Sequence, residues 1–424
     1  MLTLERPILW KQAAISVGTA LLTILAAGVA YPADPTFRIT IDQAIWQKFE
    51  FRYPATYVFS LPDGTENVTV CRRDAAGDTW TTLDVKTADD APNGVECVRF
   101  DPQQRKAYVS VGYRTTPAIQ LEFLGTSRVE FVEIARYYDG RKAAYSLSID
   151  NWGCKSVAHP GAPWKGPADD ESDNYQAAVH VCRSFHLPVS VAINSKMLGG
   201  DDVWQRMQTE LDRRDFSWEP VVHARTHPCS VKAYSVNGYD PEILGCRDDI
   251  LSRLRQIPFG QHIFTHILTC GYQDESIYQT DAGQFVFVRG YNGHDNPESV
   301  DYAPWNAKYR FYGVGGLSYK AYDAVFQSRT PAGRYYAADV QKLNDAFDQV
   351  YQSGKIIYAM WHPDRYRNSA IHDPRPGVDG EQGSTLLHHL AYVANRKDVW
   401  YVPNGWLYCY RYVAEHACVQ KAAE

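Results

Sequence analysis

AAYSLSID, residues 143–150, is an apolar segment that ends in an acidic residue, and it opens the part of the chain that decides the fold. A segment with helical periodicity follows at 170–186, and LPVSVAIN (187–194) is a second apolar strand. Strands and helices continue to alternate to about residue 396. Apolar strands that alternate with helices predict an α/β fold with a parallel sheet, here with enough strands to close into a barrel.

The remaining elements that we predict in this region follow the same pattern. They are the helix 203–215, the strand 218–227, the helix 241–257, the strands 260–268 and 285–293, the helix 340–354, the strand 355–363 and the helix 384–396.

The preceding region, residues 36–135, consists of about seven short alternating segments separated by polar turns such as PDGT (62–65) and AAGD (75–78). This pattern predicts a small all-β sandwich. The region shows no ligand spacing of His, Asp or Cys, so we expect it to be a structural or binding module.

The first residues of the chain have the features of a targeting segment. Arg6 and Lys11 precede an uncharged apolar stretch, residues 13–31, that ends in small residues. A cleaved secretory signal and an uncleaved membrane anchor both fit this pattern, and either one places residues 35–424 outside the cytoplasm. The expected parts of the chain are residues 1–34 as the targeting segment, 35–137 as the β-sandwich and 138–424 as the barrel.

The composition is that of a globular protein. The chain has 424 residues, enough for two domains, and 45% of them are hydrophobic and 22% charged. The net charge of −6 provides no basic field of the kind that binds phosphate backbones. We therefore expect no nucleic-acid partner.

All nine cysteines lie beyond the targeting segment, where an oxidising compartment permits disulfide bonds. None of their spacings is a CxxC zinc motif, so they indicate structural cross-links, with one thiol left over. The candidate pairings are Cys71 with Cys97 inside the β-sandwich, Cys409 with Cys418, and Cys229 with Cys246.

Polar residues follow several of the predicted strands at the point where each strand ends. Because the loops after parallel strands meet on one face of a barrel, we expect these side chains to form one site. They are Asp150 and Asn151, the pair His223 and His227, Arg289, and His362.

These residue types have the chemistry of a metal-dependent hydrolase. Two histidines and one carboxylate or amide oxygen can hold a divalent metal and leave a position open for water. The metal acidifies that water and polarises a carbonyl group. A carboxylate can then act as base, an imidazole can protonate the leaving group, and an arginine can keep the carboxylate ionised. Together they predict hydrolysis of an amide or an ester.

Structural roles remain open for the same residues and for other histidines. His223 and His227 could be exposed loop residues, Asp150 could cap a helix, and His362 could be a core residue with satisfied hydrogen bonds. His262 and His266 repeat the four-residue spacing inside an apolar strand, which favours a structural role.

Two further groups could contribute to a site but have simpler explanations. His388 and His389 lie on a predicted helix and are typical of surface or packing positions. His159 and the acidic run 169–171 lie in an insertion after the first strand, where a supplementary metal ligand is an alternative to a solvated loop.

The chain also resembles the polysaccharide deacetylases of carbohydrate esterase family 4, over roughly residues 140–415. The resemblance implies a distorted (β/α) barrel of about seven strands. The segments that carry it are SLSIDN (146–151), HARTH (223–227), FVRGY (287–291), AMWHP (359–363) and, as the family's final strand, DVWYVPNGWLYCYRY (398–412).

By this resemblance Asp150 is the catalytic base, Arg289 orients Asp150, and His362 is the general acid. The cofactor it implies is a divalent metal, with zinc as the expected ion. The implied metal ligands are Asn151, His223 and His227.

The sequence departs from the family pattern at two positions. Asn151 stands where members have an aspartate, and a neutral amide oxygen adds no charge to a metal site. Ala224 stands where members have Ser or Thr, which removes a hydrogen bond of the loop.

We therefore expect a secreted, periplasmic or membrane-anchored deacetylase that removes N- or O-linked acetyl groups from an extracytoplasmic polysaccharide. Hydrolysis of another amide or ester on the same barrel is one alternative. A catalytically silent carbohydrate-binding or envelope-assembly protein is another, and Asn151 keeps it open. The oligomeric state does not follow from the sequence.

Overall fold

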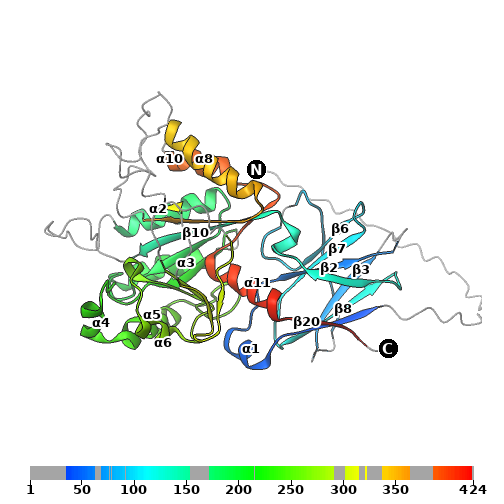
Figure 1. Ribbon diagram of the computed structural model, residues 1–424, viewed down its shortest axis with the longest axis horizontal. Helices are drawn as coiled ribbons and strands as arrows, with labels where there is room; N and C mark the ends of the chain where they lie inside the picture. Colours follow the sequence, from blue (N-terminus) through cyan, green and yellow to red (C-terminus); the bar gives the residue numbers. More distant parts are fainter. Residues whose placement is uncertain are drawn as a thin grey trace, which may run out of the picture. The chain divides into compact units, whose positions relative to one another are not determined.

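The strand β10 (Ala143–Trp152) lies inside a ten-stranded sheet and is buried along its whole length (Figure 1). It pairs in parallel with β11 (Val189–Ile193), β18 (Ile356–Trp361) and β19 (Val399–Tyr401). A strand with parallel neighbours and two covered faces is mostly apolar, and AAYSLSID has only two serines and the final Asp150 as polar residues.

The computed structural model describes residues 35–62, 68–75, 77, 79–90, 92–152, 171–213, 215–290, 301–314, 320–321, 337–362 and 385–422. The sheet around β10 has the order β15-β16-β14-β13-β12-β11-β10-β18-β17, with β19 also paired to β10. Its other strands are β12 (Trp218–Val222), β13 (Thr265–Ile267), β14 (Phe287–Arg289), β15 (Trp305–Asn306), β16 (Phe311–Gly313) and β17 (Lys320–Ala321). Within the described ranges no pairing joins β17 to β15, so the sheet is open there, and the closed barrel that the sequence suggested is not seen.

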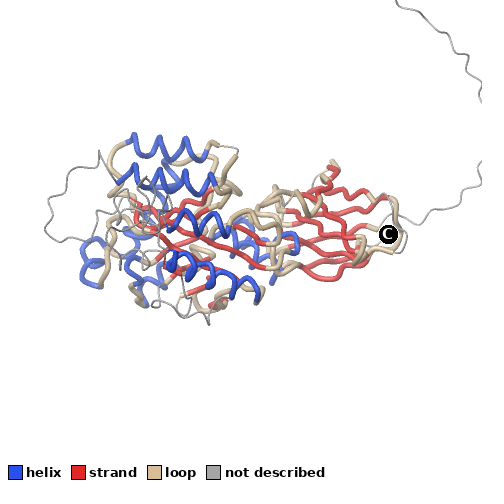
Figure 2. The backbone as a smooth tube through the Cα atoms, turned by 90° about the horizontal axis from the view of Figure 1, so that it is seen from above, coloured by secondary structure: helices blue, strands red, loops and turns tan. Residues whose placement is uncertain are grey.

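Helices gather around this sheet in the view of Figure 2, and most of them occur where the sequence predicted them. Those associated with the sheet are α2 (Glu171–Ser184), α3 (Asp201–Leu211), α4 (Val231–Asn237), α5 (Tyr239–Arg253), α6 (Glu275–Asp281), α8 (Ala337–Gln352), α10 (Thr385–Val393) and α11 (Asn404–His416). Short 3₁₀ turns, η1 (Tyr138–Gly140) and η2 (Thr269–Gly271), precede β10 and follow β13.

The segment 398–412, which was expected to be a final strand, is mainly helical. Only Val399–Tyr401 forms a strand, β19, and α11 begins at Asn404. Pro403 at the N-cap ends the extended backbone, and nearly all residues from Asn404 to Val413 are buried, so several faces of the helix are covered. The strand prediction for this segment was therefore wrong beyond residue 401.

Two five-stranded sheets, both mostly antiparallel, are formed largely by the region that was predicted to be a β-sandwich. Phe37 and Phe123 of one sheet pack on Phe59 of the other, with ring centroids 4.9 and 4.8 Å away. The first sheet, in order, contains β20 (Cys418–Lys421), β1 (Thr36–Thr40), β8 (Ala118–Leu124), β3 (Thr69–Asp74) and β4 (Thr81–Thr82). The second contains β5 (Val85–Lys86), β6 (Cys97–Asp101), β7 (Lys106–Val111), β2 (Ala55–Ser60) and β9 (Glu130–Ile134).

The edge strand β20 was not part of the sequence prediction, because it comes from the far end of the chain. It pairs antiparallel with β1, from Phe37 opposite Lys421 to Thr40 opposite Cys418. The helix α1 (Gln43–Phe49) follows β1, and Asp42 caps its start. The domain boundary expected at residue 137 stays a prediction.

The helix α11 packs in a core shared by the two small sheets and one face of the large sheet. Its Trp406 ring lies 5.9 Å from the ring of Tyr53 and 4.7 Å from that of Phe259. The Tyr410 hydroxyl donates to the carbonyl of Ala135 at 2.7 Å. One continuous apolar cluster therefore connects these sheets.

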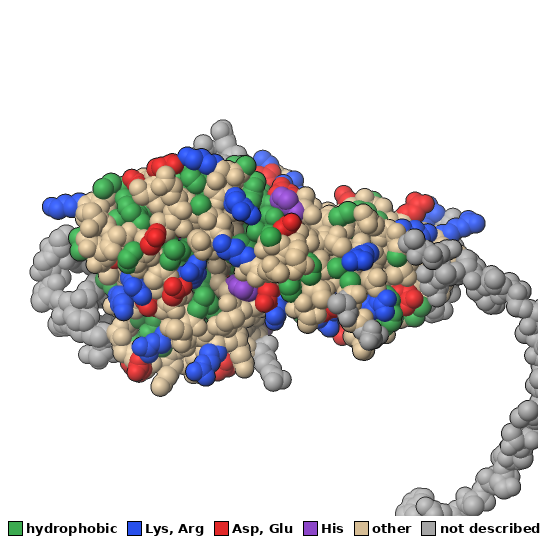
Figure 3. Space-filling model, turned by 90° about the horizontal axis from the view of Figure 1, so that it is seen from below, with side chains coloured by type: hydrophobic (Ala, Val, Ile, Leu, Met, Phe, Trp, Pro, Cys, Tyr) green, Lys and Arg blue, Asp and Glu red, His purple; other side chains and the backbone are tan. Residues whose placement is uncertain are grey.

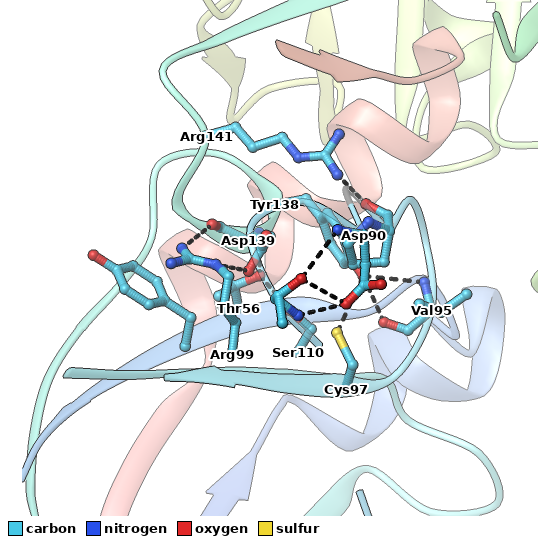
Figure 4. Close-up of polar contacts among 12 residues, drawn as sticks. Thr56, Asp90, Val95, Cys97, Arg99, Ser110, Tyr138, Asp139 and Arg141 are labelled. Carbon is cyan, nitrogen blue, oxygen red and sulfur yellow. Dashed lines mark hydrogen bonds and ion pairs between the residues drawn. The ribbon is translucent and has the colours of Figure 1, made fainter. Parts of the chain in front are cut away.

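Polar contacts beside η1 join the second small sheet to the start of β10 (Figure 4). Arg99 donates to the Asp139 carboxylate at 2.9 Å, and the Tyr138 hydroxyl donates to the carbonyl of Val95 at 2.7 Å. Arg141 donates to the carbonyl of Val399, in β19, at 2.9 Å. These bonds fix the direction in which the chain enters the large sheet.

The N-terminus of α11 is capped by side chains of the large sheet. The backbone N–H of Asn404 donates to Ser190, and that of Gly405 donates to Glu219 at 2.9 Å. Ser190 and Thr265 also donate to the Glu219 carboxyl group. Burial raises the pKa of Glu219 to about 7, although all three donors oppose that rise.

The cysteine pairings predicted from the sequence were wrong. Cys229 bonds to Cys270, which joins the loop after β12 to η2. Spacing along the chain does not report which loops meet in space, and Cys71 and Cys97 lie in different sheets. The cysteines that were expected to pair otherwise are free, namely Cys71, Cys97, Cys246, Cys409 and Cys418.

Charged side chains of both signs are interspersed over the face seen in Figure 3. Exposed ion pairs such as Arg253 with Asp201 are screened by water and salt. The stability of the fold therefore depends mainly on the buried apolar clusters.

Some predictions from the sequence fall outside the described residues. The apolar stretch 13–31, His159 and the acidic residues 169–170 are among them. Among the helices of the described residues, none is both long and apolar enough to cross a membrane.

The shared core predicts cooperative unfolding of the two small sheets with the large sheet. Replacing Trp406, which is 2% exposed, by alanine should lower the free energy of unfolding by about 3–5 kcal/mol. Val236→Ala, at a position 77% exposed, should change it by less than about 0.5 kcal/mol. Urea unfolding followed by circular dichroism and by fluorescence checks both. Two separate transitions, of which the Trp406 variant shifts only one, would contradict the shared core.

Candidate functional site

Four strands of the large sheet end in the polar residues singled out from the sequence. Asp150 lies near the end of β10, His223 follows β12, Arg289 ends β14, and His362 follows β18. All four side chains are buried, with 2 to 8% of their surface exposed. Because these strands run in parallel, the four residues lie at the same edge of the sheet.

Asn151 brings the two histidines together. Its Oδ1 lies 2.7 Å from Nε2 of His223 and 3.0 Å from Nε2 of His227. Asn151 has a left-handed backbone, with φ of 71°, a conformation that asparagine tolerates better than most residues. The pairing of β10 with β11 shifts register between Ile149 and Trp152, and this irregularity directs the amide toward the imidazoles.

The protonation of His223 follows from its contacts. Its Nδ1 lies 2.7 Å from the carbonyl oxygen of Ile267, which can only accept, so Nδ1 carries the proton. Burial and the neighbouring His227 hold the pKa of His223 well below its usual range, so the ring is neutral. Its Nε2 therefore presents a lone pair toward Asn151.

The lone pair on Nε2 of His223 thus faces the lone pairs on Oδ1 of Asn151. The Nε2 of His227 lies next to the same oxygen. Two facing acceptors repel each other unless a cation or a donor lies between them. Imidazole nitrogens and an amide oxygen are suitable ligands for a divalent metal. The donor set fits the metal that the sequence suggested.

Asp150 is held as a carboxylate. Burial would raise its pKa, but the charge of Arg289 and the hydrogen bond that this guanidinium donates outweigh burial and lower it. Arg289 donates one N–H to Asp150 and another to the hydroxyl of Ser148. Ser148 lies two residues earlier on the same strand, so a single guanidinium group fixes the end of β10.

The loop that carries the histidine pair is fixed by residues that the sequence analysis missed. Ala224 and His227 both have left-handed backbones, with φ of 60° and 59°. The buried Glu242 accepts from the backbone N–H of Thr226 at 2.9 Å and from its hydroxyl at 2.7 Å. Glu242 had no sequence signal, because an acid in the first turn of a helix is ordinary.

A second contact holds the same loop from the side of α5. Arg225 donates two hydrogen bonds to Asp249, at 2.8 and 2.7 Å. Ser195, in the loop after β11, donates to the same carboxylate at 2.7 Å. The strand-end loops after β11 and β12 are therefore connected.

The disulfide lies directly beside the histidine pair. The Sγ of Cys229 is 3.6 Å from Nδ1 of His227. Ligand atoms of His227, Cys229 and Cys270 all lie within 4.8 Å of one another. Neither cysteine was assigned to the site from the sequence, since Cys270 is not close to the motif along the chain.

Other histidines have structural partners. Nδ1 of the buried His266 is 2.9 Å from the carboxylate of Asp281. His389 is also buried, with Nδ1 2.8 Å from the side-chain oxygen of Asn344. Neither contact includes one of the strand-end residues.

A surface cavity of about 490 Å³ lies between the start of α5 and the helix α6. Tyr239 and Asp240 line it on one side, and Thr280 lines it on the other. The Tyr239 ring stacks on Tyr234, with centroids 4.7 Å apart. The Tyr234 hydroxyl lies 3.4 Å from that of Thr269, next to the disulfide.

Comparisons with known proteins give only distant similarities. No protein-family model matches the chain, and no curated protein matches it. Among solved structures, Agd3, a carbohydrate deacetylase, is 10% identical over 92% of this chain and 71% of its own, with a TM-score of 0.43. A candidate polysaccharide deacetylase from Mycobacterium smegmatis is 13% identical over 65% of this chain and 92% of its own, with a TM-score of 0.37.

A polysaccharide deacetylase from Bacillus cereus is 8% identical over 56% of this chain and 84% of its own, with a TM-score of 0.24. These TM-scores are too low for the similarities to carry any weight in assigning a function. A function for this chain therefore has to follow from its residues and their geometry.

The converging donors predict a metal site that needs both histidines. The full-length chain incubated with zinc should retain about one ion, and His223→Ala/His227→Ala should retain none, because one amide oxygen does not hold the ion alone. Elemental analysis by plasma mass spectrometry measures the content. His180→Ala/His186→Ala, at two exposed positions on or after α2, is the matched control and should keep the wild-type content. Equal zinc in the site variant and the wild type would show that the histidines are not ligands.

Proposed function

We propose that this protein is a metal-dependent hydrolase that removes N- or O-linked acetyl groups from an extracytoplasmic polysaccharide. One observation carries the proposal. The Nε2 atoms of His223 and His227 meet the side-chain oxygen of Asn151 at the strand ends, where Arg289 donates to the neighbouring carboxylate of Asp150.

The residues of the chain have distinct roles in this reaction. Asp150 takes the proton of the attacking water, because its lowered pKa leaves it able to accept one at neutral pH. Arg289 holds the carboxylate in place, with Ser148 as its second anchor. His362, which follows β18 at the same edge of the sheet, donates a proton to the leaving nitrogen or oxygen.

The ligands in this scheme would be Nε2 of His223, Nε2 of His227 and Oδ1 of Asn151. When bound, a divalent metal supplies an acidified water and polarises the acetyl carbonyl. Zinc is the ion we expect, since imidazole nitrogens are ligands that it prefers. Asn151 contributes no charge, so we expect weaker binding than an aspartate would give at this position.

Three features outside the strand-end residues support a sugar polymer outside the cytoplasm as substrate. The cavity beside Tyr239 offers an aromatic ring together with polar groups, a combination suited to a ligand with apolar faces and hydroxyls. The disulfide between Cys229 and Cys270 is typical of an oxidising compartment. The apolar segment 13–31 agrees with export.

Acetate release from a panel of acetylated glycans, with and without a chelator, tests this function. We expect release from at least one glycan, its loss with the chelator and its return with zinc. Release unaffected by the chelator would contradict the metal. Metal binding with no release from any glycan, or from simple acetyl esters and amides, would favour a carbohydrate-binding protein.

Substitutions at the end of β10 separate the base from the ligand. Asp150→Asn should lower kcat by at least about 100-fold while the metal stays bound, because only the base is lost. Asn151→Asp should keep activity and tighten metal binding by adding a charge. Metal content and acetate release are measured on both variants. Loss of metal from Asp150→Asn would mean that this carboxylate is itself a ligand, and the assigned roles would fail.

The pH dependence of the reaction tests the role of Arg289. Its charge lowers the pKa of Asp150, and a base is active only above its pKa, so activity falls as pH falls through that value. Arg289→Gln removes the charge and should move the acid limb of kcat/KM to higher pH. Arg289→Lys keeps the charge and should move it less. An unchanged acid limb in the folded Gln variant would mean that Asp150 is not the titrating base.

A further inference from the structure

The two ring nitrogens of His227 lie next to different sets of donor atoms. Nε2 is 3.0 Å from the side-chain oxygen of Asn151, in the proposed metal site. Nδ1 is 3.6 Å from the Sγ of Cys229, and the Sγ of Cys270 completes a cluster with all ligand atoms within 4.8 Å. The His227 ring therefore lies between the proposed metal site on one side and the two disulfide sulfurs on the other.

We propose that reduction of the Cys229–Cys270 disulfide creates a second metal site, made of the two thiolates and Nδ1 of His227, which binds a zinc-class ion and removes His227 from the first site. In the disulfide the sulfurs are poor ligands. Thiol–disulfide exchange with a dithiol converts the disulfide to two thiols, while the dithiol is oxidised to a disulfide. Each thiol then loses a proton when it binds the metal.

The composition of the second site favours borderline and soft ions. Two thiolates and an imidazole are three of the four ligands of a tetrahedral zinc site, and water can be the fourth. Zinc lies about 2.3 Å from a thiolate sulfur and about 2.0–2.1 Å from an imidazole nitrogen. Donor atoms within 4.8 Å of one another need only small side-chain movements to reach these distances.

The two sites exclude each other because of how imidazole carries its proton. A neutral ring has one protonated nitrogen and one nitrogen with a free lone pair. When Nε2 of His227 is a ligand, Nδ1 carries the proton. When Nδ1 binds a metal with the thiolates, the proton moves to Nε2, and the first site loses a ligand. This exclusion rests on the proposed function, whereas the thiolate site does not.

The position of the disulfide makes it accessible to a reductant. Cys270 is exposed and lies in η2, after β13, and Cys229 is half-buried and lies in the loop after β12. Opening the bond therefore breaks no strand pairing. The free cysteines of the described core, such as Cys182 and Cys246, are buried, and burial raises their thiol pKa to about 12 and about 11. They are unreactive by comparison.

Cobalt(II) absorption tests the proposal, since a cobalt–thiolate bond has a charge-transfer band in the near ultraviolet that nitrogen and oxygen ligands do not give. The full-length chain is loaded with cobalt before and after treatment with a water-soluble phosphine. The phosphine takes one oxygen from water and leaves two thiols. We expect no band in the oxidised chain and a strong band after reduction. A reduced chain without the band would overturn the second site.

Variants assign the band to its ligands. Cys229→Ser and Cys270→Ser should each lose most of it after reduction, and His227→Ala should weaken it. Cys418→Ser, which removes an exposed free thiol, and His223→Ala, outside the second site, should keep it. A band of wild-type strength in either serine variant at 229 or 270 would contradict the assignment.

The number of bound cobalt ions tests the exclusion separately. If both proposals hold, the oxidised chain binds one ion without the band, and the reduced chain binds one ion with it. Two ions in the reduced chain would overturn the exclusion. A third outcome is that the oxidised chain binds no ion and the reduced chain binds one thiolate-bound ion. That result would refute the first metal site but would support the second one.

Discussion

Parallel pairing around β10 is the constraint on which the rest of the structure depends. Strands that run in the same direction must end at the same edge, so residues far apart in the chain, such as Asp150 and Arg289, meet there. The central strands β10, β11, β12 and β18 are buried along their whole length, and charged side chains in them then need partners. Arg289 provides one for Asp150, and the start of α11 provides one for Glu219. The site and the attachment of α11 are thus two consequences of one arrangement.

The strand-end site combines a rigid base with an irregular loop. Asp150, Ser148 and Arg289 belong to strands, and hydrogen bonds across the sheet fix them. The histidine pair instead depends on two left-handed residues and on contacts with Glu242. Left-handed backbone is costly for residues other than glycine, and it persists only where surrounding contacts enforce it. The loop between His223 and His227 is therefore the part of the site most sensitive to its neighbours.

The sequence predicted the alternation of strands and helices, because the spacing of apolar residues differs between the two. It also predicted the strand-end residues, because they directly follow the apolar strands along the chain. Three features of the site could not be predicted, since each depends on which loops meet in space. They are the left-handed backbone of Asn151, the contacts of Glu242 and the Cys229–Cys270 bond. The aromatic segment 398–412 was misread for a related reason. Tyr408 and Tyr410 alternate as in a strand, but a core between three sheets buries several faces of one helix.

The pairing of β20 with β1 has a consequence for biosynthesis. Residues 36–40 leave the ribosome long before their edge partner, residues 418–421, is made. Until then β1 lacks that neighbour, and the aromatic face that α11 covers is also open. An unpaired edge and exposed aromatic side chains invite association with other chains. We therefore expect a nascent chain to be prone to such association until α11 and β20 have emerged.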